Sequence, residues 1–171
     1  MADFGGTILT ELGRNLLAKA LTGTQLTFTK VQLGDGVWNS SINPENLTSL
    51  ISPKVDLPIQ DLQVQGDGTA KLQVVLTNTG LQEGFFTREL GIFAQDPDIG
   101  EILYAVAYAP KPDFIPADGV TKVEELIEVC TVVANAQNIT AVISDTVILA
   151  TKKDVKKAIS ESFFYSYLHG G

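Results

Sequence analysis

The side chains that could carry out nucleophilic or acid–base chemistry are few in this chain. His169 is the only histidine among the 171 residues, and Cys130 is the only cysteine. A Ser-His-Asp or Cys-His arrangement would have to use His169, which is the third residue from the last. A chain terminus rarely holds an imidazole within catalytic tolerance, so we expect no histidine-dependent hydrolase. Cys130 lies in an apolar segment, where we expect a buried, inert thiol and no zinc site.

The carboxylates offer a second route to catalysis, because the chain contains 20 Asp and Glu. Glu124, Glu125 and Glu128 form one cluster, and residues 96–101 hold another. A glycosidase needs two opposed carboxylates in a cleft, which these patterns do not indicate. The Asp-x-Asp-x-Gly spacing of the second cluster opens a calcium loop, but the later ligands are missing. We interpret the clusters as a polar strand face and a hairpin turn, and we predict a non-enzymatic protein without a cofactor.

Gly34-Asp35-Gly36 and the nearby Trp38 mark a candidate binding site. The glycine pair is too short for a phosphate cradle, so we interpret it as a turn in which Asp35 accepts backbone N–H bonds. Trp38 has two interpretations, a half-buried core residue or an exposed platform for a sugar or a partner protein. In the second case Tyr104 and Tyr108 would be further platforms of a carbohydrate-binding surface.

Composition and charge narrow the class of protein. The net charge is −8, and hydrophobic residues make up 44% of the chain. This apolar fraction excludes a generally disordered chain, and the acidic balance argues against a nucleic-acid partner, which needs a basic face. No stretch approaches about 20 apolar residues, and no basic region precedes an apolar run at the N-terminus. We therefore expect neither membrane insertion nor a signal peptide, and the single cysteine suits synthesis in a reducing cytoplasm.

The charge is unevenly distributed along the chain. Residues 1–150 carry eight cationic and eighteen acidic side chains, whereas residues 151–171 carry four cations and two acids. The four cations are Lys152, Lys153, Lys156 and Lys157, which is i,i+4 spacing on a helix. They form either a solvated helix face or a contact with an acidic partner, such as the body of a neighbouring copy.

The first regular element is a helix from about Thr7 to Leu21. Its apolar residues recur every three and four positions, which is typical of a helix with one buried stripe. Thr7 or Thr10 can cap its start, and Gly23 stands where a left-handed residue often ends a helix. Gly13 either weakens the helix or permits close approach to a neighbouring element.

A run of strands follows this helix. The pattern predicts a strand over Leu26–Gly34, a short helix opened by Asn43 and Pro44, and an edge strand around Pro58. Two hairpins are predicted, one around Gly66-Asp67-Gly68-Thr69 and one around residues 96–100. Residues 121–136 fit a helix or a strand, and residues 139–149 are strand-like.

Thr151 and Asp154 resemble a capping box for a second helix, from about Lys152 to Phe163. The order of helix, strands and helix predicts an α+β fold, with a mainly antiparallel sheet or sandwich between an N-terminal and a C-terminal helix. We expect a globular domain over residues 1–150, followed by a helix and an aromatic tail over residues 151–171. The tail aromatics should pack on the domain or on another chain, because free exposure would favour aggregation.

Four stretches of the sequence match a known family in the right order and spacing. They are Ile8–Arg14 with Leu16–Ala20, Leu26–Gly36, Arg88–Ala94 and Glu101–Ala105. Residues 113–117 and 133–140 also fit. Over about Thr7 to Lys152 the chain resembles the N-terminal domain of phage tail-collar fibre proteins, which also occurs in phage-tail-like particles.

The resemblance implies a structural virion protein, made in the bacterial cytoplasm, whose domain anchors a fibre to the tail baseplate. It also implies a homotrimer, and it favours a strand over residues 121–136. Because the sequence stops at residue 171, we expect the distal receptor-binding shaft to be absent and the chain to act as a short fibre or adaptor. A distal fibre protein would be a further partner. Recognition of host glycans by a carbohydrate-binding module is the alternative function.

The C-terminal segment supplies the residues predicted to hold partners. Val155, Ile159 and Phe163 share one side of the predicted helix and would line a trimer axis. Alternatively, residues 163–168 clasp a partner fibre protein. The candidate docking residues are Phe164, Tyr165, Tyr167, Lys152 and Lys156.

Overall fold

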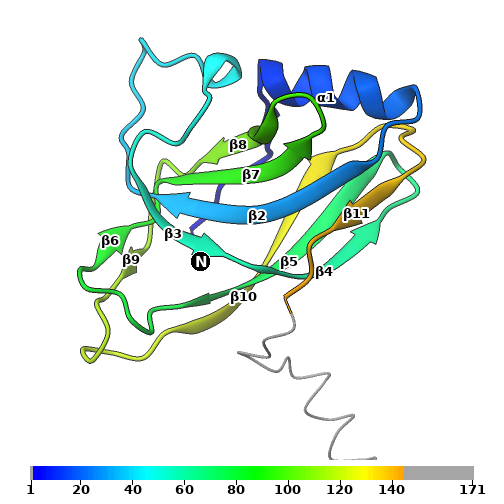
Figure 1. The fold of residues 1–171 in the computed structure, drawn as a ribbon. Helices are drawn as coiled ribbons and strands as arrows, with labels where there is room; N and C mark the ends of the chain where they lie inside the picture. The colour runs from blue at the N-terminus through cyan, green and yellow to red at the C-terminus, as the bar shows by residue number, and fades with distance from the viewer. Residues whose placement is uncertain (1, 145–171) are drawn as a thin grey trace, which may run out of the picture.

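The computed structural model describes residues 2–144. In this part of the chain the elements are β1 (Ile8–Leu9), α1 (Glu11–Leu21), β2 (Leu26–Gly34), a 3-10 turn η1 (Pro44–Asn46), β3 (Pro53–Leu57), β4 (Ile59–Val64), β5 (Thr69–Thr77), β6 (Phe85–Phe86), β7 (Glu89–Asp96), β8 (Gly100–Tyr108), β9 (Phe114–Ile115), β10 (Glu124–Val132) and β11 (Ile139–Ala141). Figure 1 shows α1 lying along one side of a layered β structure.

Helix α1 begins and ends where its side chains can satisfy the helix termini. Thr10 is the N-cap, and its hydroxyl accepts a hydrogen bond from the Gly13 N–H at 2.9 Å. Gly23 follows the C-cap with a φ of +115°, a conformation that favours glycine. The helix starts later than the predicted Thr7, because Ile8–Leu9 pair with β8 as a strand. The buried side of the helix consists of Gly13, Leu16, Leu17 and Ala20.

The larger sheet, sheet A, contains β1, β8, β7 and β2 in that order. The outer edge of β2 is shared, because β11 pairs with Leu26–Phe28 in parallel and β3 pairs with Val31–Gly34 antiparallel. Gly13 allows α1 to lie directly on this sheet, since a Cβ there would collide with the main-chain carbonyl of Tyr104 in β8. Gly13 is therefore the site of close approach that the sequence left open.

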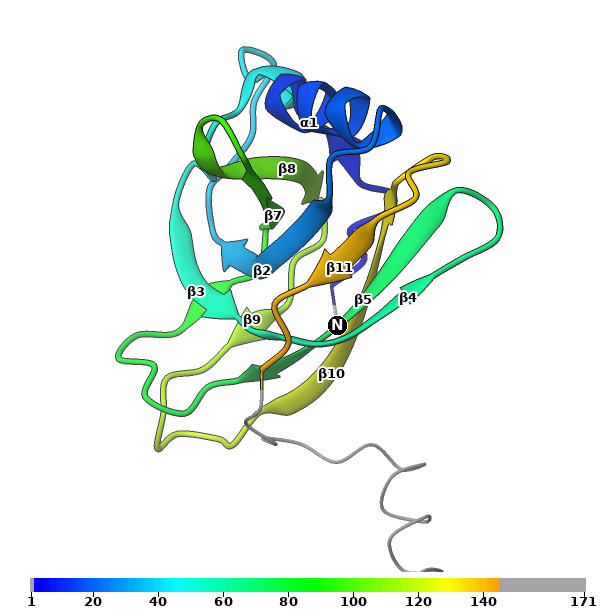
Figure 2. The same ribbon diagram turned by 45° about the vertical axis from the view of Figure 1, so that its right-hand side comes forward.

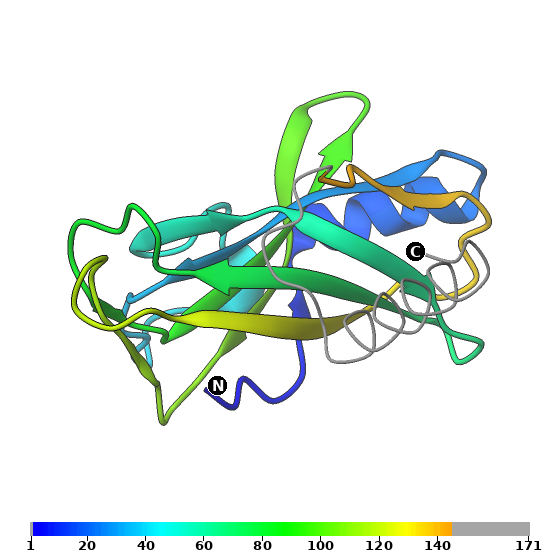
Figure 3. The same cartoon turned by 90° about the horizontal axis from the view of Figure 1, so that it is seen from below.

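The smaller sheet, sheet B, has the order β10-β5-β4 and is antiparallel throughout. Its strands lie side by side in Figure 3, where the N-terminal arm (residues 2–7) passes the β10 edge on its way to β1. The β4–β5 hairpin turns at Gly66-Asp67-Gly68, as predicted, and extends away from the body in Figure 2. The segment 121–136, which fits a helix or a strand in sequence, forms the nine-residue strand β10.

The main core lies between α1 and the two sheets. Phe28 of β2 and Tyr104 of β8 meet edge to face in its centre, with ring centroids 5.2 Å apart. Sheet B contributes its inner face through Leu72, Val74, Ile127 and Val129. Burial of this single apolar cluster stabilises the helix and both sheets together. No helix within residues 2–144 is long and apolar enough to cross a membrane.

The predicted α+β class is wrong for the structure described. Strands make up 45% of residues 2–144 and helical turns 10%, so the protein is mostly β, with one α-helix and one 3-10 turn in this range. A single 11-residue helix covers only part of sheet A, and the second sheet covers much of the remaining apolar surface. The predicted C-terminal helix lies outside the described residues, and the proposed domain division at residue 150 stays a prediction.

Candidate interaction surfaces

A buried carboxylate organises the loop that follows β2. Glu89, at the start of β7, is fully buried and accepts hydrogen bonds from three main-chain N–H groups: Gly36 (3.1 Å), Ile51 (2.9 Å) and Ser52 (2.7 Å). The indole N–H of Trp38 donates to the same carboxylate at 3.0 Å. Four donors compensate for the lost hydration of this charge, so Glu89 ties both ends of the 36–52 loop to sheet A.

The sequence predicted that Asp35 would accept the backbone N–H bonds of this turn. The acceptor is instead Glu89. The carboxylate of Asp35 instead lies 3.7 Å from the ammonium of Lys54. A Cβ at Gly36 would come within 2.7 Å of the Glu89 carboxylate, which explains the glycine. One signal in the sequence could have indicated this role of Glu89. It is an acidic residue at the start of the otherwise apolar segment that forms β7.

Trp38 is a half-buried residue within this loop, and its side chain packs against sheet A. Its ring stacks on Tyr108 with centroids 4.9 Å apart and an interplanar angle of 12°. It also contacts a small second core, which consists of Leu50, Phe93, Leu103 and Val106. Tyr104 is fully buried, so it cannot be a carbohydrate platform. Trp38 and Tyr108 each use one ring face on the other, and the half-buried interpretation of Trp38 is confirmed.

An exposed aromatic cluster lies where β6 and β9 pair as a short ribbon. The side chains of Phe86 and Phe114 are 42% and 54% exposed, and their ring centroids are 5.0 Å apart. The Arg88 guanidinium lies 4.9 Å from the centre of the Phe86 ring. We call these three residues the aromatic end. The aromatic end was not predicted, although the sequence holds one signal for it: adjacent Phe85 and Phe86 in a strand must point to opposite faces.

Hydrogen bonds and buried neighbours hold the aromatic end in place. Phe85 and Ile115, which alternate with the exposed rings, are buried in the main core. The loop beyond β9 is fixed by Asn78, whose amide donates to the carbonyls of Pro116 (3.1 Å) and Thr121 (2.6 Å). These contacts order the aromatic end before any partner binds, which lowers the entropic cost of binding.

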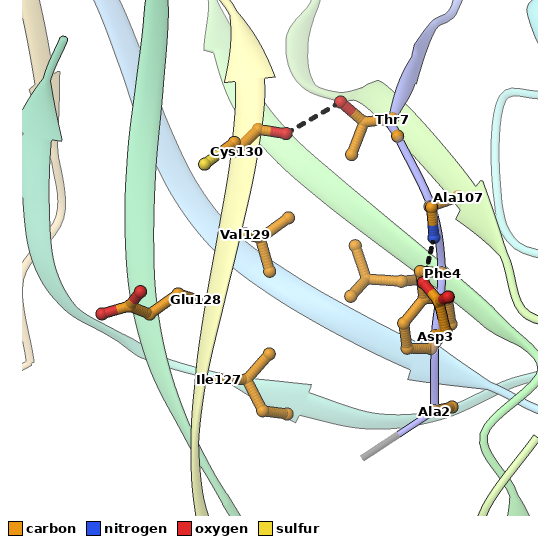
Figure 4. Close-up of a pocket in the computed structure, with 12 residues that line it drawn as sticks. Ala2, Asp3, Phe4, Thr7, Ala107, Ile127, Glu128, Val129 and Cys130 are labelled. Atoms are coloured by element: carbon orange, nitrogen blue, oxygen red, sulfur yellow. Dashed lines mark hydrogen bonds between the residues drawn. The ribbon is translucent and has the colours of Figure 1, made fainter.

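A groove of about 340 Å³ separates the N-terminal arm from β10. Ile127 and Val129 point from β10 towards the arm, whereas Glu128 points the other way (Figure 4). One side-chain hydrogen bond closes one end of the groove, from the Thr7 hydroxyl to the Cys130 carbonyl at 3.0 Å. Leu90 and Ala107 of sheet A also line it.

The structure corrects the expectation for Cys130. Its side chain is exposed, because it alternates with the buried Val129 and Thr131 and so shares the outer face with Glu128. The neighbouring carbonyl of Val132 accepts a hydrogen bond from the Tyr104 hydroxyl at 2.6 Å, which links β8 to β10 across the core. Burial raises the pKa of Tyr104, so this hydroxyl stays protonated as a donor.

The carboxylate clusters form ion pairs and turn contacts. On β10, Glu124 and Glu128 are exposed, and Glu128 lies 3.8 Å from the ammonium of Lys71. Asp96 is nearly buried, and the Lys19 ammonium donates to both of its oxygens at 2.9 Å. Burial alone would raise the pKa of Asp96, but Lys19 holds it below its ordinary value. Between residues 2 and 144, no group of three or more potential ligands is placed to hold a metal ion.

The residues predicted to hold partners at the C-terminus are not placed by the structure. Val155, Ile159, Phe163, Phe164, Tyr165, Tyr167, Lys152 and Lys156 all lie outside the described residues.

The fold and these surfaces define a layered β scaffold that presents a fixed aromatic end and a groove beside β10. A family model described as phage tail-collar fibre protein, N-terminal, matches residues 1–153. The chain therefore belongs to the phage tail-collar fibre family, as its sequence motifs suggested. The family is one of structural fibre proteins located in the virion tail. Searches of curated proteins and of solved structures found no significant match.

Proposed function

We propose that residues 1–150 attach a short tail fibre or adaptor to the baseplate of a contractile phage tail or a phage-tail-like particle, without catalysis. The observation that carries this proposal is the aromatic end formed by Phe86, Arg88 and Phe114. The family match supports a structural role in the tail fibre, and the aromatic end supplies a surface for docking.

The chemistry of the aromatic end suits a protein interface. Aromatic and arginine side chains are enriched among the residues that dominate binding energies. Both rings are about half exposed, so they keep apolar area available for a partner while their backbone is fixed by the β6–β9 pairing. Arg88 adds a donor that can reach a carboxylate or carbonyl at the rim of a contact.

A pelleting assay with purified tail particles that lack this protein tests the proposal. We expect Phe86→Ser with Phe114→Ser to lower binding of the full chain by about tenfold or more, as truncation of an interface hot spot does. Ile99→Ser is the matched control, because Ile99 is 60% exposed at the distant β7–β8 turn. Circular dichroism verifies that both variants fold. Unchanged binding of the folded double variant would contradict attachment through this end.

We further propose that the chain forms a homotrimer and that the C-terminal segment also receives a distal fibre protein. Support comes from the family and from the spacing of Val155, Ile159 and Phe163 in the sequence. Light scattering on the full chain should give the mass of three chains, and Phe163→Asp should lower it. A variant that keeps the wild-type mass would remove Phe163 from the trimer contact.

A further inference from the structure

The outer edge of β10 is an open strand edge. Because β5 pairs with one side of β10, the main-chain groups of alternate residues point to the other side. On that side, the carbonyls of Cys130 and Val132 accept side-chain hydrogen bonds from Thr7 and Tyr104. By the same alternation, the N–H and C=O groups of Leu126 and Glu128 face this edge, where no other strand of the described chain pairs.

The groove beside this edge has room for the side chains of an added strand. Ile127 and Val129 line it from β10, and Leu90 and Ala107 line it from sheet A (Figure 4). An extended segment that pairs with β10 would place every second side chain in this apolar groove and the others on the solvent face. An unpaired edge next to an apolar groove is a typical template for strand addition.

The charge around the edge indicates the chemistry of the segment. Asp3 lies on the arm, and Glu124 and Glu128 are exposed on the outer face of β10. Lys122 and Lys71, at 2.9 Å and 3.8 Å, balance part of the charge of these two glutamates. None of the residues that line the groove is cationic. The complementary segment is therefore a short β-forming stretch with lysine or arginine at one end.

The chain itself contains such a segment. Thr146-Val147-Ile148-Leu149-Ala150 is rich in β-branched and aliphatic residues, and Lys152 and Lys153 follow it after Thr151. We propose that the groove of one copy receives residues 146–150 of a neighbouring copy as a strand antiparallel to β10. In this direction the lysines arrive beside the acidic first half of β10. The proposal rests on the self-association proposed above.

The position of Ser144 favours a neighbouring copy over the same chain. Its N–H donates to the carbonyl of Ile59 at 2.8 Å, on the β4 edge of sheet B. Ile59, Val74 and Ile127 lie in one row across the three strands, so a strand beyond β10 is three strand spacings away, about 14 Å. About four extended residues are needed to cover this distance, which leaves too few of residues 146–150 to pair along β10 of the same copy.

Cysteine cross-linking of the full chain tests this proposal, because Cys130 is already exposed on β10. Residues 146, 147, 148 and 149 are changed to cysteine one at a time, and the proteins are oxidised and separated on a non-reducing gel. Strand pairing predicts a period of two, in which alternate positions cross-link to Cys130 of another chain about fivefold more than the positions between them. The matched control combines Cys130→Ser with Ile99→Cys, which moves the acceptor to the exposed β7–β8 turn, away from β4 and β10, and should give no cross-link.

Each result of this experiment decides between the alternatives. Interchain cross-links with the period of two support the exchanged strand. Cross-links within one chain would overturn the exchange and assign the groove to the same copy. Absence of cross-links in a protein with the mass of three chains would overturn the exchanged strand and leave the proposed trimer intact. A monomeric mass would overturn both.

Discussion

Two buried threonines show how differently the same side chain can act in this fold. Thr10 uses its hydroxyl fully, because it accepts from the Gly13 N–H and donates to the main-chain carbonyls of β8. Thr131, on the inner face of β10, is 2% exposed, and its hydroxyl has no hydrogen-bond partner within the described structure. An unpaired buried hydroxyl lowers the free energy of unfolding, whereas a hydroxyl that caps a helix raises it.

We expect valine to have opposite effects at these two positions. Thr131→Val should raise the free energy of unfolding by about 1 kcal/mol, because it removes an unpaired hydroxyl and keeps the β-branched shape. Thr10→Val should lower it by about 1–2 kcal/mol through loss of the helix cap. Urea denaturation of both variants measures the difference. A destabilised Thr131→Val protein would mean that this hydroxyl does have a partner.

At the scale of elements, Lys19 joins the helix to the second hairpin through ion pairs with two aspartates. Lys19, in the last turn of α1, donates to Asp96 at the end of β7 and lies 2.7 Å from Asp98 in the turn. Hydrogen bonds from Lys19 and from the Asp98 N–H hold the pKa of Asp96 below its ordinary value of 3.8, although burial opposes this. The folded protein therefore keeps Asp96 ionised at pH values where the unfolded chain takes up a proton.

The Lys19–Asp96 ion pair predicts a dependence of stability on pH. Wild-type protein should be more stable than Asp96→Asn at neutral pH, and the difference should shrink between about pH 5 and pH 3, as the unfolded state gains a proton that the folded state resists. Asp98→Asn, at a carboxylate that is 69% exposed, is the control and should change little. Denaturant titrations at several pH values provide the measurement. A constant difference down to pH 3 would show that the Asp96 carboxylate does not carry the effect.

Local signals in the sequence predicted the elements well. Thr10 and Gly23 bound α1, and Gly66-Asp67-Gly68 marks a hairpin, because caps and tight turns depend on residues close in sequence. The position of Glu89 among the N–H groups of residues 36, 51 and 52 could not be predicted in this way, since the partners are 37 or more residues away. The exposure of Cys130 was predictable, because Ile127, Val129 and Thr131 already define the inner face of β10.

The α+β class was wrong because it rested on the order helix, strands, helix, whereas the residues that the structure describes hold one α-helix and are mostly strand. A sequence shows that a strand has an apolar face, but not which element covers that face. Within residues 2–144, sheet B shares the main core with α1 and sheet A. The parallel pairing of β11 with β2 could not be predicted either, because its partners, such as Ile139 and Leu26, are far apart in the sequence.

For the whole molecule, the last described strand closes the structure. Besides the β11–β2 pairing, Val142 donates to the carbonyl of Phe28 at 2.9 Å, and Ser144 donates to that of Ile59 at 2.8 Å. Ile139 and Ala141 also pack against the main core. Residues 139–144 therefore join sheet A to sheet B at the edges of β2 and β4.

Truncation tests this closing role. A chain that ends at residue 138 should be less stable than one that ends at residue 144 by at least about 2 kcal/mol, since it loses several hydrogen bonds and the burial of Ile139 and Ala141. Differential scanning calorimetry of the two chains gives the comparison. Equal stability would mean that β11 is an accessory strand, and that β2 tolerates an open edge at Leu26–Phe28.

The direction of β11 has a mechanical consequence for a protein of the virion tail. A pull on the chain beyond Ser144, directed along β11, loads the β11–β2 pairing parallel to its strands. The hydrogen bonds of Leu26–Phe28 with residues 139–141 then share the tension and must break together, instead of opening one after another from an end. The same pull acts on the hydrogen bond between Ser144 and Ile59 of β4. The force is therefore divided between sheet A and sheet B, and it acts parallel to the strands.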